Sequence, residues 1–238
     1  MAPERYIAGY LKGVYKKLYS HFGPQHWWPA ENAFEVVIGA ILTQNTSWTN
    51  VEKAISRLKE KKLISPGRLY NTDLKTVAEL IRPCGYYNVK AARIRSFLET
   101  LFVDFKGDLS SMFLLKPALL RERLLRIKGI GPESADSILL YAAKRAVFVV
   151  DAYTRRFLLR HKLIERHASY EQVQSLFEEN LPRRLNLFNE YHALIVRLAK
   201  EFCRKRPLCN ICPLRIKKIA ASTAPTVRDN LLKVEGWK

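Results

Sequence analysis

Long apolar runs, cysteines and acidic residues are all scarce in this sequence of 238 residues. No stretch approaches the roughly 20 apolar residues that a membrane-spanning helix needs. The N-terminus mixes Glu4, Lys12, Lys16 and Lys17 with its apolar residues instead of forming a signal-peptide core. Four cysteines in a chain of this length exclude a small disulfide scaffold. We therefore expect a soluble cytoplasmic protein with no membrane partner, folded as one large domain or two modest ones.

The shortage of acidic residues gives the chain a strong positive charge. Asp and Glu total 22 against 41 Lys and Arg, which is a formal net charge of +19 spread along the whole sequence. A polyanionic partner such as nucleic acid is the natural inference. The alternative is that the charge only solvates the surface, so composition alone names no activity.

Strand patterns are almost absent. Between Glu4 and His21 apolar residues recur at helical spacing, and Gly23 and Pro24 end this first helix. Only Ala146–Val150 has the composition of a strand, and it has no obvious partner. No internal repeat or long linker occurs, and the chain is predicted to be all-α. Further helices are expected at 34–42, 49–61, 73–81, 89–105, 117–127, 133–144, 153–163, 170–181 and 185–202.

A Gly-x-Gly turn joins two of these helical patterns. Gly129 and Gly131 flank Ile130, and Pro132 opens the next helix. Free amides at such a helix start suit a phosphate oxygen of DNA. Glycine that serves only the geometry of the turn is the alternative. The residues expected to contact DNA here are Lys128, Gly129, Ile130, Gly131 and Ser134.

An apolar run, Val149-Val150, then delivers Asp151 to the start of a helix. With the hairpin, this arrangement resembles the helix-hairpin-helix DNA glycosylases that include endonuclease III. The resemblance spans about residues 25–160 and implies that Asp151 is the catalytic carboxylate, although an ordinary N-cap is the alternative. It also implies two helical domains flanking a DNA-binding cleft: 31–139, with the hairpin motif at about 119–143, and a second formed by 1–30 and 140–238.

The implied chemistry is cleavage of a base-sugar bond. The transition state has oxocarbenium character, which an ionised carboxylate stabilises. Asp151 could also orient or deprotonate water, and the base must first be extruded from the duplex. Family members that also nick the backbone keep a lysine where this chain has Glu133, and a carboxylate cannot form a Schiff base. A monofunctional enzyme is therefore favoured. Glu133 could lie near the extruded base or serve only the first helical turn.

Aromatic residues near the N-terminus resemble the 3-methyladenine glycosylase branch of the endonuclease III family. Trp27-Trp28-Pro29, then Gln44-Asn45-Thr46 followed by Trp48, match that branch, as does the segment 85–91. The resemblance assigns Trp27, Trp28, Pro29 and Trp48 to a base pocket and places Gln44 near the vacated position in DNA. Alternatively, the tryptophans fill a core and Gln44 caps a helix. An aromatic sandwich suits a positively charged alkylated purine, which needs no strong general acid to leave.

The cysteines Cys203, Cys209 and Cys212 resemble the 4Fe-4S loop of endonuclease III-like enzymes. A fourth cysteine would fall near Lys218, where there is none, and Cys84 belongs to the other expected domain. We therefore expect a degenerate cluster loop at 203–218, empty or partly occupied, and a chemistry that requires no cofactor. The basic residues in and beside it, which face DNA or merely solvent, are Arg204, Lys205, Arg206, Arg215, Lys217 and Lys218.

Together these features predict a monomeric base excision repair glycosylase for alkylated purines such as 3-methyladenine, acting on damaged double-stranded DNA. In a prokaryote it would be associated with the nucleoid. Three alternatives remain: a pyrimidine-damage glycosylase with lyase activity, a mismatch-specific adenine or thymine glycosylase, and a catalytically silent DNA-binding protein.

Overall fold

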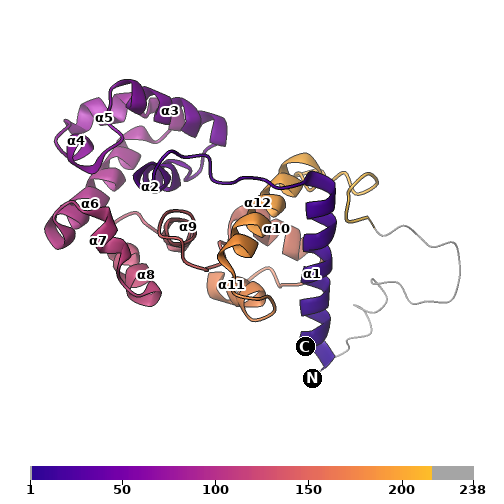
Figure 1. Cartoon of the computed structure of the whole chain (residues 1–238). Coiled ribbons are helices and arrows are strands. Elements are labelled where there is room, and N and C mark those ends of the chain that lie inside the picture. The colour runs from indigo at the N-terminus through magenta and orange to yellow at the C-terminus, as the bar shows by residue number, and fades with distance from the viewer. Residues whose placement is uncertain (1, 216–238) are drawn as a thin grey trace, which may run out of the picture. The chain divides into compact units, whose positions relative to one another are not determined.

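A computed structural model describes residues 2–215 of the chain, and every regular element in that range is a helix (Figure 1), which confirms the all-α prediction. The chain divides into two compact units. Unit 1 contains the described parts of Met1–Gln25, Val150–Leu181 and Tyr191–Lys238, and unit 2 contains His26–Val149 and Pro182–Glu190. The boundaries between the units fall after residues 25 and 149, whereas the expected boundaries were after 30 and 139. The segment 182–190 also groups with unit 2.

Unit 1 is built from both ends of the described chain. It contains α1 (Ala2–Phe22), α10 (Ala152–Arg160), α11 (Tyr170–Glu178) and the part of α12 (Leu185–Glu201) that begins at Tyr191. Tyr191 ties the last helix to the first, because its buried hydroxyl donates to the Leu11 carbonyl at 2.8 Å. Its ring also packs edge-on against Tyr15, with 5.3 Å between centroids. The predicted amphipathic face of the first helix therefore packs on the last one.

Unit 2 surrounds one apolar helix. Every residue of α2 (Ala33–Leu42) from Phe34 to Leu42 is buried, so this helix must be covered on all sides. The elements that follow are α3 (Trp48–Glu60), α4 (Pro66–Tyr70), α5 (Leu74–Leu80), the 3-10 helix η1 (Arg82–Cys84), α6 (Tyr87–Phe105), α7 (Leu109–Phe113), α8 (Pro117–Arg126), α9 (Pro132–Ser137) and the π-helix η2 (Ile138–Ala142).

The segment Ala146–Val150, which has the composition of a strand, has no regular structure. Phe148, Val149 and Val150 are nevertheless buried. Phe148 packs edge-on against Phe188, with ring centroids 5.5 Å apart, and the Val150 amide donates to the Tyr170 hydroxyl at 3.3 Å. The run is apolar because it passes through the interior, not because it pairs with another strand.

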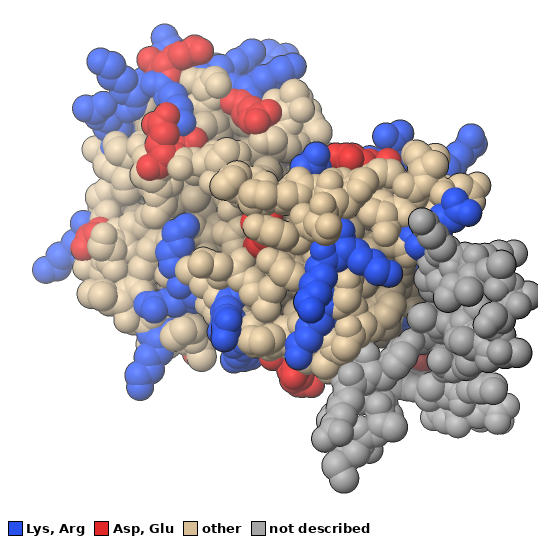
Figure 2. Space-filling view, turned by 45° about the vertical axis from the view of Figure 1, so that its right-hand side comes forward, with Lys and Arg blue, Asp and Glu red and all other residues tan. Residues whose placement is uncertain are grey.

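Basic side chains outnumber acidic ones on the face shown in Figure 2, in keeping with the composition. None of the helices between residues 2 and 215 combines the length and the apolar character that crossing a membrane requires.

Candidate functional site

The predicted hairpin forms in unit 2 between α8 and α9. Its helices are joined by a fully buried carboxylate: Asp136 on α9 accepts two hydrogen bonds from Arg121 on α8, at 2.7 and 3.2 Å. A two-bond guanidinium pair of this kind fixes both distance and orientation. The turn between the helices is therefore held on a rigid base.

The two glycines of the turn have different reasons to be glycine. Gly129 has φ +91°, and a Cβ there would lie 2.3 Å from Cγ of Arg93 on α6. Both its backbone conformation and its neighbour exclude a side chain. Gly131 is extended, with φ −94° and ψ 179°, and a Cβ would meet nothing within 4 Å. Only Gly129 must be glycine for the turn to form. Gly131 places no side chain over the N-terminus of α9.

Gln44, which follows α2, binds this hairpin directly. Its side-chain Nε2 donates to the Gly129 carbonyl and to the Ser134 hydroxyl, each at 2.9 Å. Its Oε1 accepts from Nη1 of Arg93. Gln44 and Ser134 were predicted as separate DNA contacts, and the structure brings them together in one network. Arg93 also belongs to this network, although no sequence motif marks it as a site residue.

The other residues predicted to contact DNA differ in how exposed they are. Lys128, Gly129 and Gly131 are exposed, whereas the Ile130 side chain is buried and its amide donates to the Ile127 carbonyl at 3.0 Å. Ile130 thus holds the turn from inside. Glu133 is exposed in the first turn of α9, where a negative charge interacts favourably with the helix dipole.

Three tryptophans predicted as a base pocket form one cluster in unit 2. The ring centroids of Trp27 and Trp48 are 4.8 Å apart, those of Trp28 and Trp48 5.1 Å, and those of Trp27 and Trp28 5.4 Å. All three rings are partly exposed, and Pro29 beside them is exposed. The cluster therefore combines close ring packing with some exposed indole surface.

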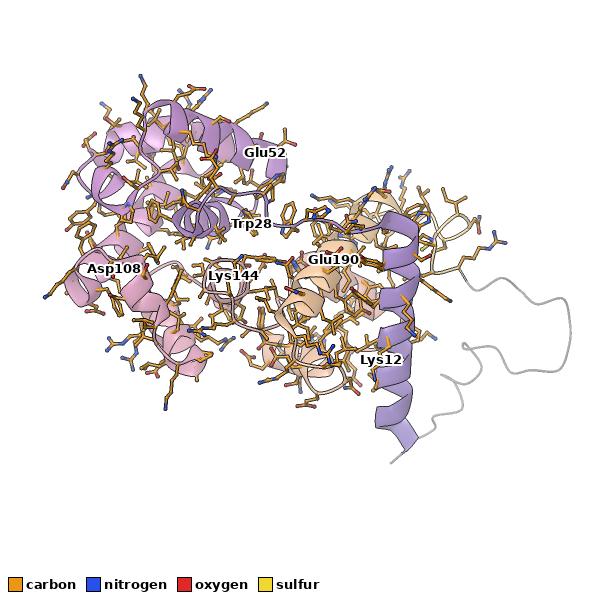
Figure 3. All side chains as sticks on the ribbon, viewed as in Figure 1. Lys12, Trp28, Glu52, Asp108, Lys144 and Glu190 are labelled. Atoms are coloured by element: carbon orange, nitrogen blue, oxygen red, sulfur yellow. The ribbon has the colours of Figure 1, made fainter. Side chains whose placement is uncertain are left out.

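The cluster is oriented by residues that the sequence did not single out. Trp28 packs on α2, where a Cβ at Gly39 would lie 3.0 Å from its Cζ2, and on the buried ring of Tyr141 in η2, 5.2 Å away. In Figure 3, Trp28 lies next to α2, and Glu52 projects from α3. The Trp48 indole donates to a carboxylate oxygen of Glu52 at 2.8 Å.

Asp151 lies in unit 1 as the N-cap of α10, so the capping alternative describes its local structure correctly. Its Oδ1 accepts from the Thr154 amide at 2.7 Å. Its Oδ2 lies 3.6 Å from Nε2 of His192 on α12, and the Asp151 side chain is only 13% exposed. Burial by itself raises the pKa of Asp151, but His192 and the Thr154 amide outweigh it and hold the pKa below its ordinary value. The carboxylate is therefore ionised at neutral pH.

The cysteine loop, also in unit 1, offers three thiols, one fewer than the four that a 4Fe-4S cluster normally takes. Its three cysteines differ in exposure, Cys203 being buried and Cys209 exposed. The chain's fourth cysteine, Cys84, is buried in unit 2, where its thiol donates to the Asn50 carbonyl at 3.4 Å. No group of three His, Cys, Asp or Glu residues able to hold a metal occurs between residues 2 and 215. Lys217 and Lys218 lie outside the described residues.

Arginines of α10 organise the start of this loop. Arg160 donates to the carbonyls of Cys203, Arg204 and Lys205 and to the Cys203 sulfur, and Arg156 donates to the carbonyls of Ala199 and Cys203. Backbone carbonyls at the C-terminal end of α12, which lack partners within the helix, thus accept hydrogen bonds from guanidinium groups. The loop is held by these bonds among the described residues.

Comparisons with known proteins agree with this architecture. A family model described as HhH-GPD superfamily base excision DNA repair protein matches residues 38–183. The chain is 48% identical over 203 residues to MJ1434 of Methanocaldococcus jannaschii, named provisionally as a DNA repair glycosylase, covering 85% of this chain and 92% of that protein. It is 29% identical over 185 residues to endonuclease III of Sulfolobus acidocaldarius, covering 77% and 80%.

Two solved structures are similar. One is the H. pylori 3-methyladenine DNA glycosylase MagIII bound to 1,N6-ethenoadenine, with a TM-score of 0.66 and 30% identity, covering 83% of this chain and 97% of that chain. The other is a non-covalent endonuclease III-DNA complex, with a TM-score of 0.75, 20% identity and coverage of 87% and 92%. At that identity the endonuclease III complex supports the fold alone.

The chain therefore belongs to the HhH-GPD superfamily of base excision DNA repair proteins. Within the superfamily it is an endonuclease III-like DNA glycosylase.

Proposed function

We propose that this glycosylase is monofunctional and releases alkylated purines such as 3-methyladenine from damaged double-stranded DNA. The observation that carries the proposal is the partly exposed cluster of Trp27, Trp28 and Trp48, with ring centroids 4.8–5.4 Å apart. The named activity of MagIII, which is 30% identical to this chain, supports the same substrate class.

The cluster suits a cationic base for a physical reason. A purine alkylated at N3 or N7 carries a positive charge, and indole rings attract cations through the electron density of their faces, by about 0.5 to 2 kcal/mol per contact. An undamaged purine would stack on the same rings without this term. Discrimination would then come from charge as well as shape, after the base leaves the duplex.

The charge of the base also simplifies the chemistry. A cationic purine leaves as a neutral molecule, so no strong general acid is required. The remaining task is to stabilise positive charge that develops on the sugar, for which an ionised carboxylate is suited. We assign this role to Asp151, whose lowered pKa keeps it charged at neutral pH. The same carboxylate can orient the attacking water.

Glu133 supports the monofunctional part of the proposal. It stands at the position where lyase members of the family keep a lysine, and a carboxylate cannot form an imine with the sugar. The reaction would therefore end at an abasic site, with no cofactor needed. We further propose that the protein acts as a monomer.

The test is base release from methylated DNA, with each freed base identified by mass spectrometry. We expect 3-methyladenine or another alkylated purine among the products, at single-turnover rates well above those on DNA with oxidised pyrimidines or with mismatches. Release of oxidised pyrimidines alone would favour an endonuclease III type of activity. Release of only a mismatched adenine or thymine would favour a mismatch glycosylase, and either result would contradict the proposed substrate class.

A further inference from the structure

The described part of unit 1 contains a buried acid-base pair that the sequence did not reveal. His192 on α12 places Nε2 3.6 Å from Oδ2 of Asp151, and the two side chains are 8% and 13% exposed. We propose that His192 is the positioning residue for the Asp151 carboxylate. This inference rests on the catalytic role that the proposed function gives to Asp151.

The two oxygens of Asp151 are divided between two elements. Oδ1 is held by the Thr154 amide on its own helix at 2.7 Å, which is the bond of an ordinary N-cap. A cap needs only that bond. His192 comes from a different helix and faces the other oxygen at ion-pair rather than hydrogen-bond distance, so it acts on the oxygen that the cap does not hold. The 3.6 Å separation can shorten when substrate binds, as such contacts often do.

His192 also acts on the charge of the carboxylate. A carboxyl group that is desolvated without a partner becomes protonated, and a neutral acid cannot stabilise an oxocarbenium ion. Burial raises the pKa of Asp151, and the hydrogen-bonding and charge interactions of His192 are the largest influences that lower it again, followed by the Thr154 amide. His192 thus counteracts the cost of placing the acid in a dry environment.

Arginines of α10 and a tyrosine of α11 are engaged elsewhere, and the Thr154 side chain is a further influence, smaller than His192, that lowers the Asp151 pKa. Arg155, on α10, donates to the carbonyls of Ala168 and Ser169 at 2.6 and 3.5 Å. Arg156 donates to the Ala199 and Cys203 carbonyls at the end of α12. On α11 the Tyr170 hydroxyl accepts from the Val150 amide. Among residues 2–215, His192 is the basic group that lies at ion-pair distance from Asp151.

The experiment compares His192→Phe, which keeps a ring and removes the donor, with His192→Gln, whose longer amide can still reach Oδ2. Single-turnover base release from methylated DNA is measured across pH, and the Asp151 carboxyl is titrated by carbon-13 NMR in free protein, assigned with Asp151→Asn. In His192→Phe we expect the acidic limb and the carboxyl pKa to move up together by about one pH unit, which is about tenfold in rate on that limb. His192→Gln should restore part of the shift.

Tyr191→Phe is the matched control. It removes a buried hydrogen bond to Leu11 from the neighbouring position of the same helix and leaves both members of the pair in place. We expect it to lower thermal stability without moving the acidic limb. If His192→Phe does not fold, His192→Asn replaces it, because its side chain is too short to reach Oδ2.

A wild-type carboxyl pKa and acidic limb in the donor-free variant would overturn the inference, as would a rate loss equal at every pH. Failure of the proposed function looks different. In that case Asp151→Asn would retain base release, or methylated DNA would not be a substrate, while the NMR titration would still report whether His192 acts on Asp151.

Discussion

Replacing Gly129 by alanine should damage the hairpin, whereas the same replacement at Gly131 should not. The two positions lie in one turn and undergo one chemical change, so they form a matched pair. Gly129 has φ +91° and no room for a Cβ, and Gly131 is extended and open. The contrast tests whether the turn is fixed by its backbone and by Arg93.

The cost at Gly129 has two parts. Holding an alanine in the left-handed region costs about 1 kcal/mol. The new Cβ would lie 2.3 Å from Cγ of Arg93, so Arg93 must move and lose its hydrogen bond to Gln44. That bond is charge-assisted but partly exposed, which makes its loss worth about 1.5 kcal/mol. The sum is about 2.5 kcal/mol, or roughly 5–10 °C in the melting temperature of a chain of this size.

The assay is thermal unfolding followed by tryptophan fluorescence. Trp27, Trp28 and Trp48 all lie in unit 2, so the signal is dominated by the unit that contains the hairpin. Gly131→Ala should stay within about 0.5 kcal/mol of the wild type, because the residue is already extended. In an Arg93→Ala background, Gly129→Ala should cost only the backbone part, about 1 kcal/mol. Equal stability of the two alanine variants would refute the reasoning, and so would an unchanged cost in the Arg93→Ala background.

Three further predictions concern the chemistry. Borohydride treatment during base release from methylated DNA should trap no protein-DNA adduct, because Glu133 offers no amine; an adduct that accumulates at the rate of base release would show that another lysine acts. Purified protein should carry fewer than four irons per chain and lack an iron-sulfur absorption band, since three clustered thiolates do not complete a 4Fe-4S site; a full four-iron centre would contradict this. Trp48→Ala should weaken release of a cationic alkylated purine by about three- to thirtyfold through the lost cation-π contact, whereas Trp48→Phe should keep part of it; an equal effect of both changes would remove the aromatic argument.

Much of the fold could be predicted because it follows from sequence patterns between residues that are close in the chain. The long helices follow apolar periodicity, and the hairpin follows two glycines and a proline at fixed spacing. The composition of Ala146–Val150 decides nothing about its structure, because a short apolar run has the same composition whether it pairs as a strand or only crosses the interior. The five-residue helices α4 and α7 are too short for a periodic signal.

The candidate site divides in the same way. Asp151 stands out in the sequence because the hairpin and the Val149-Val150 run before it resemble the helix-hairpin-helix glycosylases. His192 is not visible, because a histidine on an amphipathic helix gives no sign of a partner on α10. Gln44 was singled out through the resemblance to the endonuclease III branch, but its role in the hairpin depends on a bond to Gly129, 85 residues away. Arg93 has no sequence signal at all, and only the packing of α6 reveals it.

The central claim is that an ionised Asp151 carries the glycosylase reaction, and Asp151→Asn tests it most directly. The change removes the charge and keeps the size of the side chain, and asparagine is an equally good N-cap, so α10 should be retained. Base release from methylated DNA should be abolished under single-turnover conditions, while affinity for the same DNA stays within a few-fold of the wild type. Base release at the wild-type rate by a folded Asp151→Asn protein would contradict the account.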